Sequence, residues 1–165
     1  MCGISGILLS QQRPNQQDLL RMTSVLHHRG PNDRGIWHDQ NVGLGHTRLS
    51  IIDLTATGHQ PMVSDRNQAV IVFNGEIYNF RDIRPRLESL GYHFKSRTDT
   101  EAVLHAYEHY DVRCLKDFEG MFAFAIWAPW EKSLFLARDR LGEKPLYYYF
   151  DDHRFAFSSE INALL

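Results

Sequence analysis

The segment Phe122-Ala123-Phe124-Ala125-Ile126-Trp127 constrains the fold more than any other, because every one of its residues is apolar. Side chains alternate between the two faces of a strand, so a strand here would be apolar on both faces. Such a strand requires a sheet that is covered on both sides. A buried helix is the alternative interpretation of a single run of this kind. The segment therefore favours a layered sandwich.

The order of the other elements indicates an α+β fold rather than a regular alternation of strands and helices. Helical patterns cluster toward the middle of the chain and strand patterns toward both ends. A helix is expected through Ile83 and Leu87, closed by Gly91, and Thr98 with Glu101 fits a capping box at the start of another. The remaining expectations are a helix over 16–26 and strands over 3–9, 42–52, 69–73, 121–127, 134–138, 147–150 and 154–158.

Asn74-Gly75 lies between an apolar run and Glu76-Ile77-Tyr78, which is a strong short signal for a hairpin. We therefore expect a strand, a turn and a second strand. The dipeptide also has a functional interpretation, which is compatible with the first. An Asn amide and the Gly75 N–H can converge on a developing oxyanion, and glycine lets the backbone approach a ligand closely.

Composition excludes several classes of function. A chain of 165 residues fits one domain, and a formal net charge of −2 with mixed acids and bases argues against binding to nucleic acid or to a membrane surface. No apolar run is long enough to span a bilayer, and no signal peptide is recognisable. Two cysteines and nine scattered histidines predict neither a disulfide framework nor a metal site. The composition favours a cytoplasmic domain.

Cys2 follows the initiator Met1 directly and precedes Gly3. If Met1 is removed, the chain begins with a cysteine that carries both a thiol and a free α-amine. The amine, with a reference pKa of about 7.7–8.0, can accept the thiol proton during attack, so one residue supplies nucleophile and base. A buried or terminal cysteine without such a role is the alternative interpretation.

Other segments carry candidate substrate-binding residues. Arg48 follows an apolar strand pattern and can hold a carboxylate through two parallel hydrogen bonds, although a solvated ion pair is the alternative. Asp99, if close to Glu76, can hold an ammonium group, or it can simply complement the dipole of a helix start. The charged segment 138–148 is expected to form an exposed turn or an interface loop, with no catalytic role assigned.

Together these segments resemble the class II glutamine amidotransferase domain, an N-terminal-nucleophile hydrolase, and in particular the glutaminase domain of glutamine-hydrolysing asparagine synthetases. The resemblance covers nearly the whole chain. It rests on eight motifs in order: Met1-Cys2-Gly3-Ile4, His28-Arg29-Gly30-Pro31, the stretch from Gly45-His46 to Ser50-Ile51, Phe73-Asn74-Gly75-Glu76, Thr98-Asp99-Thr100-Glu101, Gly120 to Ala125, Arg138-Asp139-Arg140-Leu141-Gly142, and Lys144-Pro145-Leu146-Tyr147-Tyr148.

The resemblance implies a four-layer αββα sandwich over residues 1–165. It also implies that Cys2, once N-terminal, attacks the side-chain amide of L-glutamine, so that ammonia leaves and water releases glutamate from a thioester. No metal or organic cofactor is needed for this half of the chemistry.

The same resemblance assigns roles to the other candidates. Arg48 would bind the α-carboxylate of glutamine, and Glu76 and Asp99 would hold its α-ammonium. Asn74 and Gly75 would form the oxyanion hole. The pocket would be lined, largely through backbone atoms, by Leu49, Ser50, Ile51 and Ile52.

Two departures from the family pattern matter. Pro31-Asn32 followed by Asp33 replaces the usual Arg-Gly-Pro-Asp, which leaves the role of Asp33 open. The chain has no Ser-Gly-Gly-x-Asp-Ser pyrophosphate loop, so the ATP-dependent synthetase domain, with its ATP and Mg, is absent from it. The chain is expected to supply ammonia to an asparagine-synthetase-like reaction of such a domain or subunit. The alternative is a weak or inactive docking or regulatory domain, and homo-oligomer formation stays open.

Overall fold

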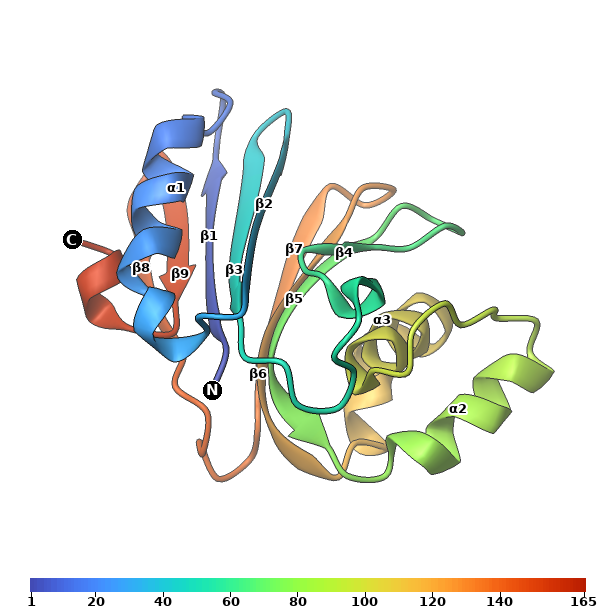
Figure 1. Ribbon diagram of the computed structural model, residues 1–165. Helices are drawn as coiled ribbons and strands as arrows, with labels where there is room; N and C mark the ends of the chain where they lie inside the picture. Colours follow the sequence, from blue (N-terminus) through green and yellow to red (C-terminus); the bar gives the residue numbers. More distant parts are fainter.

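Two antiparallel sheets lie face to face in the computed structural model, which describes residues 1–165 (Figure 1). The first sheet has the order β2 (Asp33–Asp39), β3 (Val42–Arg48), β1 (Gly3–Leu9), β9 (Arg154–Ser158) and β8 (Tyr147–Phe150). The second has the order β4 (Met62–Val63), β5 (Val70–Ile77), β6 (Gly120–Ala128) and β7 (Ser133–Arg138). The N-terminal strand β1 is thus central, paired with β3 on one side and β9 on the other.

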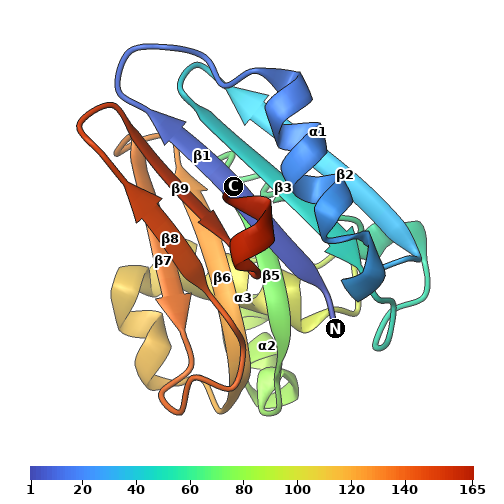
Figure 2. The same cartoon turned by 90° about the vertical axis from the view of Figure 1, so that its left-hand side faces the viewer.

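Helices cover the outer face of each sheet. Helix α1 (Gln16–Val25) and the C-terminal turn Ile161–Ala163 lie over the first sheet (Figure 2), and α2 (Phe80–Ser89) and α3 (Asp99–Tyr110) lie over the second. Short 3-10 helices at His27–Arg29, Ala56–Gly58 and Asp111–Lys116 complete the chain. The four layers confirm the predicted α+β, αββα sandwich.

Strand β6 explains why the sandwich needs all four layers. Ala123, Ala125 and Trp127 contribute to the core between the two sheets, where they meet Ile4, Leu44 and Phe157. The alternate residues Phe122, Phe124 and Ile126 join the larger core beneath α2 and α3. The prediction that this strand is covered on both faces is confirmed, because both sets of side chains are at most 3% exposed.

The predicted turn at Asn74-Gly75 is wrong. Residues 70–77 form one strand, β5, and Asn74 and Gly75 pair with Ala123 and Phe122 of β6. The glycine is required by close packing rather than by a turn, since a Cβ at Gly75 would lie 2.4 Å from the Met121 carbonyl oxygen. The neighbouring strand, which is remote in sequence, therefore decides the conformation of this dipeptide.

The glycines of β3 do not interrupt it. A Cβ at Gly43 would lie 2.4 Å from the Leu19 side chain, and one at Gly45 would lie 2.2 Å from the Thr23 hydroxyl. These two positions therefore allow α1 to pack closely against the first sheet. The predicted extended segment 42–52 ends as a strand at Arg48 and continues as a loop.

The three predicted helices are present. Gly91, with φ of +86°, follows the C-terminal end of α2. The Thr98 hydroxyl accepts the Glu101 N–H at the start of α3, as half of a capping box does. The other half is absent, since the Glu101 carboxylate instead accepts the N–H groups of Lys95 and Ser96.

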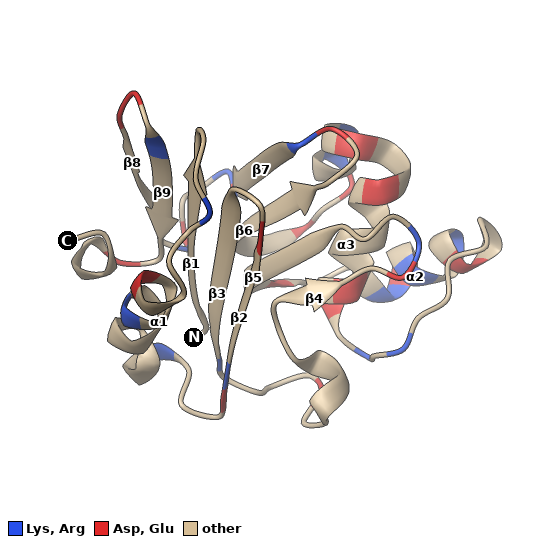
Figure 3. Ribbon diagram, turned by 90° about the horizontal axis from the view of Figure 1, so that it is seen from above, with Lys and Arg blue, Asp and Glu red and all other residues tan.

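Charged residues lie mostly on helices and loops, whereas the strands carry few of them (Figure 3). Both signs of charge occur on α2, whereas α3 carries Asp99, Glu101 and Glu108 and no Lys or Arg (Figure 3). None of the helices is both long and apolar enough to cross a membrane.

Candidate active site

A cavity of about 130 Å³ lies beside the N-terminus, where the two sheets meet the start of α3. It collects residues from segments that are far apart in the sequence. Nearly all the predicted site residues line it, namely Cys2, Arg48, Leu49, Ile51, Ile52, Asn74, Gly75, Glu76 and Asp99. Ser50 does not line it, since its N–H is directed to the Asn32 side-chain oxygen at 3.0 Å.

Cys2 directly precedes β1 and contacts Leu49, which directly follows β3. Its Sγ accepts a hydrogen bond from Leu49 N at 3.4 Å and lies 3.8 Å from Leu49 O. Burial raises the pKa of the Cys2 thiol, while the Leu49 N–H and the nearby positive charges of the N-terminus and Arg48 oppose the rise. A thiol in this environment needs a neighbouring base to become a nucleophile.

The backbone next to Cys2 is also clamped. Arg29 donates from Nε to Cys2 O at 3.0 Å and from Nη1 to the Glu160 carboxylate at 2.9 Å. The Ile4 N–H is bound to the Ser159 hydroxyl at 3.0 Å. The sequence pointed to Arg29 only as part of a motif and did not reveal that it binds the backbone of Cys2.

Arg48 ends β3 with its guanidinium at the cavity wall, and the residue is only 7% exposed. Its Nη1 donates to Thr55 O at 2.8 Å, and its Nη2 donates to Asp53 O. Gly58 makes room for the guanidinium, because a Cβ there would lie 2.0 Å from Nη2. A guanidinium has five N–H donors, so three remain for a ligand.

Asn74 supplies a polar group that has no partner. Its side chain lies in the middle of β5, it is 1% exposed, and its Nδ2 makes no hydrogen bond. Burying an amide donor without an acceptor is costly. Since Asn74 and Gly75 line the same cavity as Cys2, this unused donor is well suited to a negatively charged oxygen formed there.

Asp99 and Glu76 contribute two carboxylates to the lining of the cavity. Asp99 accepts the N–H of Ile77 at 2.9 Å and that of Thr100 at 3.0 Å. Burial raises the pKa of Asp99 to about 6, a rise that these hydrogen bonds oppose and the charge of Glu76 increases. A ligand cation between the two carboxylates would relieve this cost.

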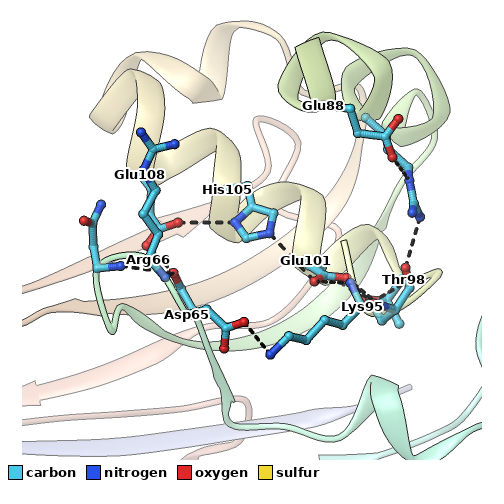
Figure 4. A network of polar contacts seen from close by, with 12 residues as sticks. Asp65, Arg66, Glu88, Lys95, Thr98, Glu101, His105 and Glu108 are labelled. Atoms are coloured by element: carbon cyan, nitrogen blue, oxygen red, sulfur yellow. Dashed lines mark hydrogen bonds and ion pairs between the residues drawn. The ribbon is translucent and has the colours of Figure 1, made fainter. Parts of the chain in front are cut away.

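A polar network anchors the chain that leads into Asp99 (Figure 4). His105 of α3 lies between Glu101 and Glu108, with Nδ1 3.2 Å from Glu108. Burial by itself lowers the pKa of His105, but the two carboxylates outweigh it and raise the pKa to about 9. Glu101 in turn holds the N–H groups of Lys95 and Ser96 at 2.8 and 2.7 Å. The first turn of α3 is thereby fixed.

The segment 138–148 reaches the cavity, which the sequence did not indicate. Asp139 bends this segment by accepting the N–H groups of Glu143 and Lys144 at 2.8 and 2.9 Å. Lys144, only 6% exposed, lines the cavity and directs Nζ to within 3.3 Å of Met1 Sδ. A local charge pattern could not show that this loop folds back toward the N-terminus.

Asp33, whose role the sequence left open, lies outside the cavity. It starts β2 and forms a hydrogen bond with His59 at 2.7 Å.

No group of three or more His, Cys, Asp or Glu residues is arranged to hold a metal ion.

Known proteins share both the sequence and the fold of this chain. The whole chain, residues 1–165, matches the family described as glutamine amidotransferase domain. It is 40% identical over 169 residues to glutamine-hydrolyzing asparagine synthetase 3 of Bacillus subtilis, which covers all of this chain and 27% of that protein. It is 34% identical over 168 residues to glutamine-hydrolyzing asparagine synthetase B of Escherichia coli, which covers all of this chain and 30% of that protein. The chain thus spans less than a third of these curated relatives.

A solved structure supports the fold. The glutamine phosphoribosylpyrophosphate amidotransferase of Bacillus subtilis, complexed with ADP and GMP, superposes with a TM-score of 0.81 at 21% identity. The match covers 99% of this chain and 43% of that one. The resemblance noted in the sequence is therefore confirmed, and the chain belongs to the glutamine amidotransferase domain family, with relatives among the glutamine-hydrolyzing asparagine synthetases.

Proposed function

We propose that this domain hydrolyses the side-chain amide of L-glutamine through Cys2 and supplies the ammonia to an ATP-dependent synthetase domain or subunit of the asparagine synthetase kind. One observation carries the proposal. Cys2, Arg48, Asn74 and Asp99 come from four separate segments and line a single cavity. The relatives are glutamine-hydrolyzing asparagine synthetases several times longer than this chain, which supports the synthetase acceptor.

Substrate binding in this proposal uses the guanidinium and the two carboxylates that line the cavity. The free N–H groups of Arg48 bind the α-carboxylate in a bidentate manner. Glu76 and Asp99 bind the α-ammonium. Fixing both charged groups of glutamine leaves its side chain as the only part free to reach Cys2. The binding energy at the α-carbon thereby serves to orient the amide for attack.

The proposed reaction starts with attack of the Cys2 sulfur on the amide carbon of glutamine. Removal of Met1 frees the α-amine, which accepts the thiol proton and passes it to the departing nitrogen. The carbonyl oxygen becomes an oxyanion, which the Asn74 Nδ2 and the Gly75 N–H stabilise. The carbon–nitrogen bond then breaks, ammonia leaves, and a thioester remains. Water, deprotonated by the same amine, cleaves the thioester to glutamate and restores Cys2.

The test compares the wild-type protein with Cys2→Ala. Intact mass should show that Met1 has been removed, and only the wild type should convert L-glutamine to glutamate. A cysteine-reactive glutamine analogue should block the wild type with a stoichiometry of one label on Cys2. Retained hydrolysis in Cys2→Ala would contradict the mechanism.

One other result would favour the alternative function. A processed Cys2 terminus without glutamate release, even in the presence of a synthetase partner, would indicate a docking or regulatory domain. Partner binding unaffected by Cys2→Ala would then be expected.

A further inference from the structure

Asp53 is a buried carboxylate that neither the chemistry above nor the sequence motifs explain. It lies in the loop that connects β3 to the 3-10 helix Ala56–Gly58, and it is 7% exposed. Its Oδ1 accepts hydrogen bonds from the Thr55 N–H at 2.9 Å and from the Thr55 hydroxyl at 2.7 Å. Its Oδ2 accepts one from the Thr57 hydroxyl at 3.1 Å. The carboxylate thus folds residues 53–57 into a tight turn.

This turn is what holds Arg48. The two carbonyl oxygens that receive the guanidinium are those of Asp53 and Thr55, which are the first and third residues of the turn. Their direction depends on the Asp53 carboxylate, because it fixes the peptide groups between them. The guanidinium therefore has its orientation before a ligand arrives, and three N–H groups stay free.

The same carboxylate ties the turn to a second segment. Asp53 Oδ2 also accepts the Arg97 N–H at 3.0 Å, two residues before Asp99. The hydrogen bonds from Thr55 and Arg97 lower the pKa of Asp53 well below its usual range, so it is ionised at neutral pH. Asp99 itself is held separately, by Ile77 N, Thr100 N and the network around Glu101. Loss of Asp53 should therefore disturb Arg48 far more than Asp99.

We propose that Asp53 is a positioning residue for glutamine, which acts by holding Arg48 ready for the α-carboxylate. The proposal rests on the proposed function, in which Arg48 binds that carboxylate. A guanidinium ordered in advance loses little conformational freedom on binding, which favours affinity. Displacement of a binding group by about 1 Å can cost roughly 100-fold. The removal of Asp53 should accordingly weaken glutamine binding without changing the reacting groups.

The test uses Asp53→Ala and Asp53→Asn with two amides. L-Glutamine has the α-carboxylate, and 4-aminobutanamide is the same molecule without it. The affinity of each amide is measured by how strongly it protects Cys2 from iodoacetamide, and the turnover of glutamine is measured in parallel. We expect Asp53→Ala to raise KM for glutamine roughly 10- to 100-fold, with kcat within about threefold, and to leave protection by 4-aminobutanamide unchanged. Asp53→Asn should show the same pattern with a smaller effect.

Two controls separate this proposal from the proposed function. Asp151→Ala removes a carboxylate that accepts the N–H groups of His153 and Arg154 in a distant turn. This variant should change the affinity for neither amide. Arg48→Met should weaken the binding of glutamine but not that of 4-aminobutanamide. If glutamine binding is not weakened selectively, the assignment of Arg48 to the α-carboxylate is wrong. Suppose that Arg48→Met behaves as expected. The role of Asp53 would then be overturned if the Asp53 variants lost affinity equally for both amides, or if they lost no affinity for glutamine.

Discussion

Asn74 offers the sharpest test of the site, because the structure predicts that its replacement by an apolar residue lowers activity without lowering stability. Its Nδ2 is buried without a partner. An unsatisfied buried donor costs about 1–3 kcal/mol of stability. In Asn74→Leu, an apolar side chain of similar size replaces the amide, so this cost disappears while the strand stays filled. The free energy of unfolding should stay unchanged or increase by about 1–2 kcal/mol.

Activity should fall in the same variant. The loss of one oxyanion donor costs about 10²–10³ in kcat, which corresponds to about 2.7–4 kcal/mol. The kcat is measured from glutamate release, and the stability from urea unfolding followed by tryptophan fluorescence. The polar group of Asn74 would thus belong to the reaction and not to the fold.

Asn79 provides a matched control for this experiment. Its side-chain amide is satisfied, since Nδ2 donates to Asp117 O at 2.8 Å and Oδ1 accepts the Glu119 N–H at 3.2 Å. Asn79→Leu should therefore lose about 1–2 kcal/mol of stability and keep its kcat. A kcat within threefold of the wild type in Asn74→Leu would refute the oxyanion assignment. A clear loss of stability in that variant would refute the argument from the unpaired amide.

Two further predictions concern titratable groups. Burial raises the pKa of Asp99 to about 6, so this carboxylate becomes protonated as the pH falls through 6. If it holds the substrate ammonium as proposed, KM for glutamine should rise there, and Asp99→Asn should have a high KM with no such pH dependence. A flat wild-type KM between pH 5 and 8 would contradict this. For His105, the folded-state pKa of about 9 lies above the unfolded value, so its stabilisation is complete below about pH 6.5 and disappears as the pH rises through 9. His105→Gln should lose on the order of 2 kcal/mol at pH 6 and much less at pH 9.5 in urea unfolding, and an equal loss at both pH values would count against the ion pairs.

The apolar periodicity of the chain predicted most of the fold. Strand β6 and the helices carry patterns that local sequence reveals, since each buries side chains on at least one face. Strand β8 was recognisable from its run of aromatic residues, although all four of them are exposed. Strand β2 carries no such pattern, because it lies at a sheet edge and Gly35 is its only buried residue. The conformation of Asn74-Gly75 depended on Met121 and Phe122, which no local signal could supply.

The site was predictable only at residues whose own side chain suggests a role in binding or catalysis. Cys2, Arg48, Glu76 and Asp99 were identified as candidates from their motifs and line one cavity. Arg29 and Asp53 were not, since Arg29 donates to the Cys2 carbonyl oxygen and the Asp53 carboxylate accepts the N–H groups of Thr55 and Arg97. Contacts of that kind exist only after the chain has folded, so a residue that supports the site looks in sequence like any other surface charge.

The central position of β1 bears on when during synthesis the domain can act. Strand β1 pairs with β9, which is synthesised much later, and Ile4 exchanges hydrogen bonds with Ser159, 155 residues further along the sequence. A nascent chain that lacks residues 154–159 has an unpaired edge along the strand that carries Cys2, and it lacks the Glu160 carboxylate that holds Arg29. Cys2 would therefore reach its place in the site only after residues 154–160 have joined the fold.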